Sequence, residues 1–248
     1  MNPDCVHCRF FDSPKEHNHP LLTNRPGGLE GTKRALAYCS LPAQAKVVDI
    51  ACGKGATIQL LRETYGYRAI GIDISGRMLK EAGNYALGAN LVQGDCVHLP
   101  LQDESQDAVM MECAFHFDPN PTAVLGEMAR ILKPEGYLIL SDLYLRTAEQ
   151  KDFVPRNSVS SCLTNIQTRS QIFEGIEGAG FTTRIWADQD DLLKQWIWEM
   201  TFNGLSVRSF FASLLGEDCD SGTTVQISKP GSIGYYILVA QKTIPMRN

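Results

Sequence analysis

The sequence of 248 residues lacks any long hydrophobic run, and this excludes a chain that crosses a membrane as an apolar helix. Its longest uninterrupted apolar stretch, Tyr235 to Ala240, is six residues long, whereas a spanning helix needs about 18 or more. The first twenty residues also lack a basic start followed by an apolar stretch, the pattern of a secretory signal peptide. We therefore expect a cytoplasmic protein with no membrane partner.

The sequence also lacks any cluster of five or more lysine and arginine residues, and its formal net charge is −5. Proteins that bind nucleic acid usually carry a basic patch or stripe that neutralises phosphates. We therefore expect no nucleic-acid partner and a small molecule as substrate. The sequence does not indicate an oligomeric state.

The composition is that of one ordinary globular domain, with 44% hydrophobic and 21% charged residues. No internal repeat or low-complexity tract interrupts it. The eight cysteines stand in a long chain without a signal peptide, so reduced thiols are expected rather than a disulfide framework.

Short apolar runs alternate with longer segments of helical period, which is typical of a parallel sheet with crossover helices. The expected strands are 46–51, 68–73, 90–93, 107–111, 137–140, 181–186 and 235–241. The expected helices are 56–65, 76–86, 121–132, 170–177 and 190–215. No crossover unit of the earlier kind separates the last two strands. The sequence thus predicts an α/β fold whose seven-stranded, mostly parallel sheet has an antiparallel last strand and helices on both faces.

Two segments, 1–28 and 190–215, fall outside the repeating pattern. Open α/β sheets bind ligands at the carboxyl ends of their strands, so both segments are expected to lie over that edge. We interpret 1–28 as an amino-terminal lid or extension, 29–243 as one cofactor-binding domain, and 190–215 as a helical insertion within it that caps the substrate.

The strongest local pattern is Asp49-Ile-Ala-Cys-Gly-Lys-Gly55, between a predicted strand and a predicted helix. Small residues let the backbone approach a ligand, and a helix N-terminus favours a carboxylate or phosphate. Asp73 ends the next strand, 24 residues after Asp49, where a carboxylate can accept both hydroxyls of a ribose. Together these features predict a cofactor that contains adenosine.

The glycine turn by itself leaves other classes of protein open. A dinucleotide fingerprint G-x-G-x-x-G that starts at Gly53 would need glycine where Ile58 stands, so an NAD-dependent oxidoreductase is an imperfect alternative. A non-catalytic module that binds a cofactor or senses a metal is a third interpretation.

The ordered motifs resemble those of class I S-adenosylmethionine-dependent methyltransferases, of the bacterial small-molecule type (methyltransferase domain 11 or 25). The first motif of that family is an acid followed by G-x-G-x-G, and it stands here at 49–55 with Ala51 in place of the first glycine. Further segments match in order at 71–75, 93–100, 103–109 and 132–137. Arg25-Pro-Gly-Gly28, together with Ser141-Asp-Leu-Tyr-Leu-Arg146, is similar to a bacterial subgroup of these enzymes, for which we name no substrate.

The resemblance implies a Rossmann-like fold, S-adenosylmethionine as the cofactor, and methyl transfer to a small-molecule acceptor by in-line displacement. It implies that Asp49 lies near the ammonium group, Asp73 at the ribose and Asp95 at the adenine amino group. The full set of cofactor-binding residues that it implies is Asp49, Ala51, Cys52, Gly53, Gly55, Asp73, Ile74, Asp95, Cys96, Glu112 and Cys113. The methyl group of Ala51 should be tolerated if the φ angle there is negative.

A hydroxyl or ammonium acceptor must also lose a proton, and two residues near the end of the fourth strand could accept it. His116 is the first candidate base because the unperturbed pKa of histidine lies near 6.5. The competing interpretation is that His116 only packs or caps its loop. Glu112 is the second candidate, and its competing role is that of a structural acid beside the cofactor.

Three residues are candidates for contact with the substrate. Tyr144 and Arg146 follow the fifth strand directly. Trp198 shares a helical face with Phe202, although such aromatic stripes more often belong to a hydrophobic core. We predict all three as substrate contacts.

The amino-terminal segment holds Cys5 and Cys8 in a C-x-x-C spacing, followed by His17 and His19. This set suits zinc in principle, but the H-x-H spacing is tighter than usual and no hydrophobic core surrounds it. We therefore predict no metal site. A methyltransferase that uses its cysteines to hold a metalloid or thiol acceptor stays an alternative.

Overall fold

The computed structural model describes residues 25–147, 165–202 and 231–244. The strands are β1 Lys46–Ile50, β2 Arg68–Asp73, β3 Asn90–Gln93, β4 Gln106–Glu112, β5 Leu132–Leu145, β6 Phe181–Asp188 and β7 Ile233–Lys242. The helices are α2 Gly28–Leu36, α3 Ala56–Glu63, α4 Gly76–Tyr85, α5 Pro121–Ile131, α6 Arg169–Gly178 and α7 Asp190–Phe202, with a short 3-10 helix, η1, at Phe115–Phe117. None of the helices in these ranges has the length and apolar character that a bilayer crossing requires.

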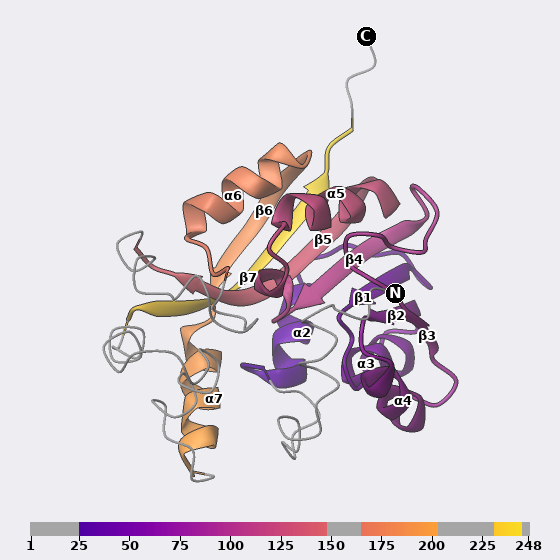
Figure 1. Ribbon diagram of the computed structural model, residues 1–248, viewed down its shortest axis with the longest axis horizontal. Coiled ribbons are helices and arrows are strands. Elements are labelled where there is room, and N and C mark those ends of the chain that lie inside the picture. Colours follow the sequence, from indigo (N-terminus) through magenta and orange to yellow (C-terminus); the bar gives the residue numbers. More distant parts are fainter. Residues whose placement is uncertain (1–24, 148–164, 203–230, 245–248) are drawn as a thin grey trace.

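The seven strands form one sheet in the order β3-β2-β1-β4-β5-β7-β6 (Figure 1). Neighbours from β3 to β5 run parallel, whereas β7 pairs antiparallel with both β5 and β6. The predicted fold class, with its reversed last strand, is confirmed. The chain order changes direction between β1 and β4, and the carboxyl ends of strands at such a switch point form a crevice where ligands bind.

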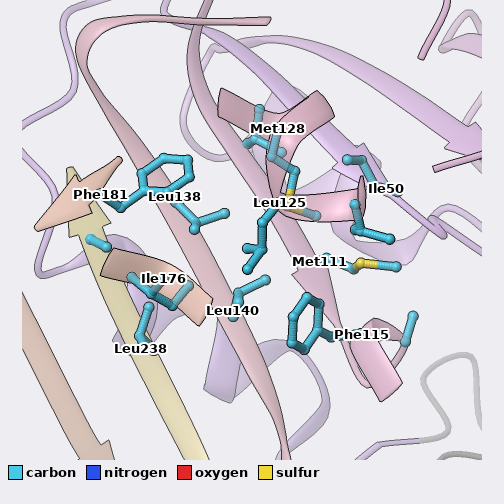
Figure 2. Close-up of a cluster of buried hydrophobic side chains, with 14 of the residues drawn as sticks. Ile50, Met111, Phe115, Leu125, Met128, Leu138, Leu140, Ile176, Phe181 and Leu238 are labelled. Atoms are coloured by element: carbon cyan, nitrogen blue, oxygen red, sulfur yellow. The ribbon is translucent and has the colours of Figure 1, made fainter. Parts of the chain in front are cut away.

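Helices cover both faces of the sheet, as the sequence predicts. Along β5, Leu138 and Leu140 face α5 and α6, where Figure 2 shows them beside Leu125 and Ile176. The intervening Ile139 belongs to the other cluster, under α2 and α3. Side chains of successive residues alternate between the faces of a strand, so β5 contributes to both cores.

The fifth strand is longer than predicted, because β5 continues past the point where β4 ends. Glu112, the last residue of β4, pairs with Ser141, while β5 and β7 stay paired as far as Leu145. The polar residues Ser141 and Asp142 interrupt the apolar pattern, yet both are buried. The two strands therefore extend beyond the carboxyl edge and form a wall beside the crevice.

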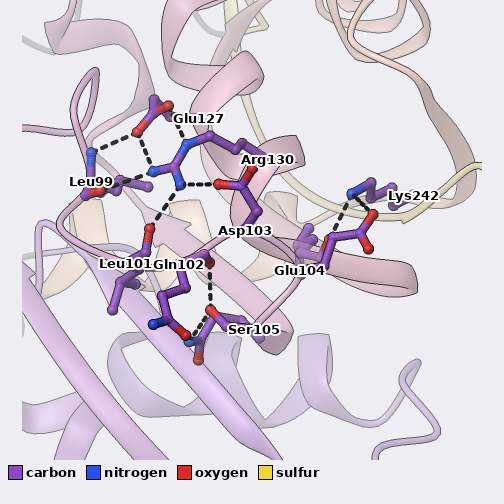
Figure 3. Close-up of polar contacts among 11 residues, drawn as sticks. Leu99, Leu101, Gln102, Asp103, Glu104, Ser105, Glu127, Arg130 and Lys242 are labelled. Carbon is purple, nitrogen blue, oxygen red and sulfur yellow. Dashed lines mark hydrogen bonds and ion pairs between the residues drawn. The ribbon is translucent and has the colours of Figure 1, made fainter.

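Arg130 of α5 holds the loop between β3 and β4 in place (Figure 3). Its guanidinium donates to the carboxylates of Glu127 and Asp103 and to the carbonyl oxygens of Leu99 and Leu101, at 2.7 to 2.9 Å. Glu127 in turn accepts the backbone N–H of Leu99 at 2.7 Å. The loop that carries two of the predicted adenine contacts is thus fixed to a helix.

We expect Gly234→Ala to destabilise the protein. Gly234 lies opposite Tyr144 in the β5–β7 pair, and an added Cβ would lie 2.2 Å from Cε1 of that ring. Edge contacts with Trp186 and Tyr236 hold the ring, so the clash cannot be relieved without disturbing its neighbours. Such overpacking costs about 1–3 kcal/mol in the free energy of unfolding, measurable by urea denaturation.

Gly126→Ala is the matched control for this substitution. Gly126 is an exposed residue of α5, and a Cβ there would meet nothing within 4 Å. Alanine in an open helical position should stabilise the protein by about 0.5–1 kcal/mol. Equal denaturation midpoints for the two variants would contradict the packing described for Gly234.

Candidate active site

The glycine turn follows β1 at the switch point of the sheet. Gly53 and Gly55 both adopt positive φ angles, 52° and 79°. A Cβ added at Gly53 would meet nothing within 4 Å, whereas one at Gly55 would lie 3.1 Å from Cβ of Ala82 in α4. Gly53 therefore presents its backbone to open space where a ligand can approach, and Gly55 lets the start of α3 pack on α4.

Ala51 does not meet the condition that the sequence analysis set for it, because its φ angle is 58°. A residue with a Cβ in this left-handed region loses roughly 1–2 kcal/mol relative to the right-handed one, and glycine does not. The departure from the family motif at this position is therefore a source of backbone strain beside the turn.

We expect Ala51→Gly to raise the free energy of unfolding by about 1 kcal/mol, because glycine relieves the strain at positive φ. Gly53→Ala is the matched control, since it places a Cβ at positive φ in open space and should lower stability by a similar amount. Chemical denaturation of both variants measures the difference. An unchanged or lower stability for Ala51→Gly would mean that the turn carries no such strain.

Asp73 connects the end of β2 to the glycine turn. Its carboxylate accepts the backbone N–H groups of Gly53 at 2.8 Å and of Ser75 at 2.9 Å. The Ser75 hydroxyl accepts the N–H of Met78 and caps α4. Because a carboxylate accepts about four hydrogen bonds, Asp73 can hold the turn and accept ribose hydroxyls at the same time.

Asp49, Asp73 and Glu112 place three buried carboxylates at the carboxyl ends of neighbouring strands, with side chains from β1, β2 and β4. Burial, together with the charges of Glu112 and Asp73, raises the pKa of Asp49, and the nearby guanidinium of Arg25 opposes this. A positively charged ligand group would compensate this excess of negative charge.

The loop after β3 carries Asp95 and Cys96, both partly buried. The Asp95 carboxylate accepts the N–H of Val97 at 3.1 Å, and the Cys96 thiol lies 3.8 Å from the carboxylate of Asp118. Burial and the two acids raise the pKa of the Cys96 thiol, so it stays protonated. This loop supplies a carboxylate acceptor at the position implied for the adenine amino group.

Two other residues of the implied cofactor set, Cys52 and Ile74, lie next to the glycine turn and Asp73. The Cys52 thiol is buried, and a Cβ at Gly71 would lie 2.8 Å from its sulfur. Its side chain thus packs into the core, and only its backbone belongs to the turn. Ile74 is half-buried beside Asp73.

Cys113 follows β4 directly and faces the wall formed by β5 and β7. It has a φ angle of 52°, and its N–H donates to the carbonyl of Ser141 at 2.7 Å. Its sulfur lies 3.8 Å from the hydroxyl of Tyr235, which also donates to the Ser141 hydroxyl at 3.1 Å. This thiol is partly exposed, so it borders the space above the strand ends.

His116 lies in η1 and is 1% exposed. Its Nε2 is 2.8 Å from the carbonyl oxygen of Leu143. A carbonyl only accepts, so Nε2 carries a proton and donates it, and Nδ1 is the nitrogen that could accept one. The role of His116 as a general base stays a prediction.

Tyr144 and Arg146 lie together on the wall beyond the strand ends. The Tyr144 hydroxyl donates to Asp188 at 2.5 Å and accepts from Arg146 at 3.2 Å, and Arg146 also pairs with Asp190 at the start of α7. Trp198 stands eight residues further along α7, about 12 Å at 1.5 Å per residue, and is 73% exposed. The structure therefore brings Tyr144 and Arg146 together but leaves Trp198 apart from them.

Three residues of this site, Arg25, Thr32 and Thr57, are not among those that the sequence predicts. Arg25, from the chain before α2, contacts Glu112, and the hydroxyls of Thr32 and Thr57 stand between them. Of these three residues, only Arg25 belongs to a segment, Arg25-Pro-Gly-Gly28, that resembles the family in sequence. Two other parts of the sequence analysis lie outside the described residues: Cys5, Cys8, His17 and His19, for which no metal site is predicted, and the part of the predicted insertion from 203 to 215.

The fold and this edge define a Rossmann-like α/β protein whose site suits an adenosine-containing, positively charged cofactor. Residues 48–140 match the family described as "Methyltransferase domain". Over these residues the chain is therefore similar to S-adenosylmethionine-dependent methyltransferases, and this likeness supports S-adenosylmethionine as its cofactor. The NAD-dependent alternative is not favoured.

Known proteins with the same kind of domain are similar over different shares of the chain. A phthiotriol/phenolphthiotriol dimycocerosates methyltransferase of Mycobacterium ulcerans is 28% identical over 151 residues, 58% of this chain and 55% of that protein. A demethylmenaquinone methyltransferase of Renibacterium salmoninarum is 28% identical over 219 residues, 86% of this chain and 90% of that one. The chain thus spans about half the length of the first relative and most of the second.

A solved structure shows the same fold. Phosphoethanolamine N-methyltransferase 2 of Haemonchus contortus, in complex with S-adenosyl-L-methionine, has a TM-score of 0.68 and 16% sequence identity. The match covers 89% of this chain and 54% of that one. At this identity the likeness concerns the fold alone.

Proposed function

We propose that this protein transfers the methyl group of S-adenosylmethionine to a small-molecule acceptor by in-line displacement. The observation that carries the proposal is the set of three buried carboxylates at the strand ends around an open glycine turn. A sulfonium and an ammonium group both carry positive charge, and this edge is negative. The match of residues 48–140 to a methyltransferase domain supports the same conclusion.

The bound cofactor supplies an already activated methyl group, so the residues of the protein have to position the donor and the acceptor. In this proposal the backbone at Gly53 lies against the methionyl part and Asp49 accepts its ammonium. Asp73 accepts the ribose hydroxyls, and Asp95 accepts the adenine amino group. Holding acceptor and donor in line and excluding water accounts for several kcal/mol of such a reaction barrier.

The acceptor side of the proposed reaction lies above Cys113, along the wall of β5 and β7. Tyr144 and Arg146 are the proposed substrate contacts on this wall, Arg146 through its exposed side chain and Tyr144, which is 5% exposed, through the hydroxyl next to it. Trp198 is also proposed as a substrate contact, and this role requires an acceptor that extends to the exposed surface of α7. The two relatives described above are named for a dimycocerosate lipid and a quinone precursor, which favours an acceptor with an extended apolar part.

The thiol or metalloid alternative gains no support from the part of the chain that the structure describes. Among the described residues the cysteines Cys39, Cys52, Cys96 and Cys113 form no disulfide. Among the described residues no three cysteines gather as a site that could hold a metalloid. Cytoplasmic location and the absence of a nucleic-acid partner remain proposals from the sequence.

Calorimetry with S-adenosylmethionine and with NAD tests the cofactor assignment. We expect the wild type to bind the methyl donor and not NAD. Asp73→Ala should weaken binding about tenfold to a hundredfold, because hydrogen bonds to a charged group contribute about 1.5–3 kcal/mol. Asp107→Ala is the matched control, since Asp107 lies at the opposite end of the sheet on β4 and binds Lys46 and Lys133. Absent donor binding, or equal affinity in both variants, would overturn the assignment.

His116→Gln tests the proposed general base once an acceptor is in hand. Glutamine can still donate to the carbonyl of Leu143 but cannot accept the proton, so turnover should fall about a hundredfold or more while cofactor affinity stays unchanged. If turnover matches that of the wild type, His116 only holds its loop.

A further inference from the structure

Arg25 lies at the centre of a closed hydrogen-bonded cluster beneath the cofactor edge, the carboxyl edge of the sheet at Asp49, Gly53 and Asp73. Its Nη2 lies 2.7 Å from Oε2 of Glu112, 2.9 Å from the hydroxyl of Thr32 and 2.8 Å from that of Thr57. Both hydroxyls donate to the Glu112 carboxylate, at 2.9 Å and 3.0 Å for the shorter contacts. Each threonine therefore accepts from the cation and donates to the anion.

The cluster joins four separate parts of the chain. Thr32 lies in the middle of α2, Thr57 in the first turn of α3, and Glu112 at the end of β4, while Arg25 precedes α2. The side chains of Arg25 and Glu112 are 14% and 2% exposed. Since α3 begins directly after the glycine turn, any shift of this cluster is transmitted to the backbone that approaches the cofactor.

The two glycines after Arg25 explain how its side chain reaches this place. Gly27 and Gly28 have φ angles of 71° and 48°, and the N–H of Gly28 donates to the carbonyl of Arg25 at 3.1 Å. A Cβ at Gly27 would lie 2.6 Å from Cδ1 of Leu192 in α7. The turn brings the chain close to α7 and leads Arg25 under α2, toward β4.

Asp49 is the carboxylate that this cluster affects most directly. The charged groups that face it are Glu112 from β4, Asp73 from β2 and the guanidinium of Arg25. The two acids disfavour its ionised form, and the guanidinium favours it. Without Arg25, Asp49 would face two carboxylates and, among the residues that the structure describes, no cation.

We propose that Arg25 is a positioning residue of the cofactor site, which neutralises Glu112 so that Asp49 can serve as the ionised partner of the cofactor's ammonium group. The inference rests on the proposed function, because it takes the methionyl group of S-adenosylmethionine as the ligand of Asp49. It assigns Glu112 to the support of the site, where it acts through Asp49.

The first experiment measures S-adenosylmethionine affinity by calorimetry between pH 6 and 8 for the wild type, Arg25→Gln and Arg25→Lys. Loss of the cation in Arg25→Gln raises the pKa of Asp49 further. The pH at which the affinity for S-adenosylmethionine increases should therefore be higher in this variant than in the wild type. Each unit of that movement weakens binding up to about tenfold at pH values below the pKa of Asp49. Arg25→Lys keeps the charge and should recover part of the affinity.

Adenosine is the matched ligand, since it contacts the ribose and adenine side of the site and lacks the methionyl group. Its affinity should be the same in the wild type and in Arg25→Gln. Arg34→Gln is the matched variant, because Arg34 also lies in this segment but pairs with Asp191 and Glu30, away from Asp49. It should bind S-adenosylmethionine as the wild type does.

Two results would overturn the inference: an equal loss of affinity for adenosine and S-adenosylmethionine, or a loss that is the same at every pH. Either would mean that Arg25 only supports the fold. A wild type that binds adenosine and not S-adenosylmethionine would instead overturn the proposed function. The two failures are thus distinguishable.

A second pair of variants covers the case in which Arg25→Gln does not fold. Glu112→Gln and the double variant Arg25→Gln/Glu112→Gln both lack the carboxylate at position 112. Neither variant therefore contains a buried anion without a cation beside it. The affinity for S-adenosylmethionine should rise with pH at a higher pH in the double variant than in Glu112→Gln. Coincident pH profiles would contradict the role of Arg25.

Discussion

The balance of buried charge at the carboxyl edge is the constraint on which the rest of the site depends. Three carboxylates, Asp49, Asp73 and Glu112, are buried there, and moving an ion out of water costs several kcal/mol unless it is compensated. Backbone amides hold Asp73, and Arg25 with two threonines holds Glu112. Asp49 remains the group whose compensation a cationic ligand can complete, which links the electrostatics of the fold to cofactor binding.

The surrounding elements serve this edge by fixing loops that would otherwise be free to move. Arg130 binds the loop after β3 to α5 (Figure 3). Asp73 binds the glycine turn to the end of β2. The extension of β5 and β7 adds a wall on the acceptor side. A reaction that depends on alignment needs such rigid support, because small displacements of the reacting groups are costly.

Most of the architecture could be predicted from the sequence. The number of strands, the reversed last strand and the helices on both faces follow from periodicity and from the turns between elements, whereas the order of the strands in the sheet comes from the structure. The predicted strand 137–140 was too short, because the pairing of β5 with β7 buries Ser141 and Asp142 against the apolar pattern. Polar residues in a strand are identified as buried only when their partners are known.

The cofactor edge could be predicted in part. Asp49, Gly53 and Asp73 lie together at the carboxyl edge of the sheet, because the carboxyl ends of parallel strands meet at one edge. The side chain of Cys52 turned away from that edge into the core, and the backbone at Ala51 took the left-handed conformation. Neither outcome has a sequence signal, because both depend on how the turn packs against β2 and α3.

The sequence by itself determined the class of fold and the residue types at the cofactor edge, because strand and helix periods and turn residues are local properties. Only the tertiary structure decided which charges meet. Arg25 and Glu112 are 87 residues apart, and their contact exists because α2, α3 and β4 converge at one place. Electrostatic pairing depends on distance and burial in space, and the order of residues along the chain does not encode either directly.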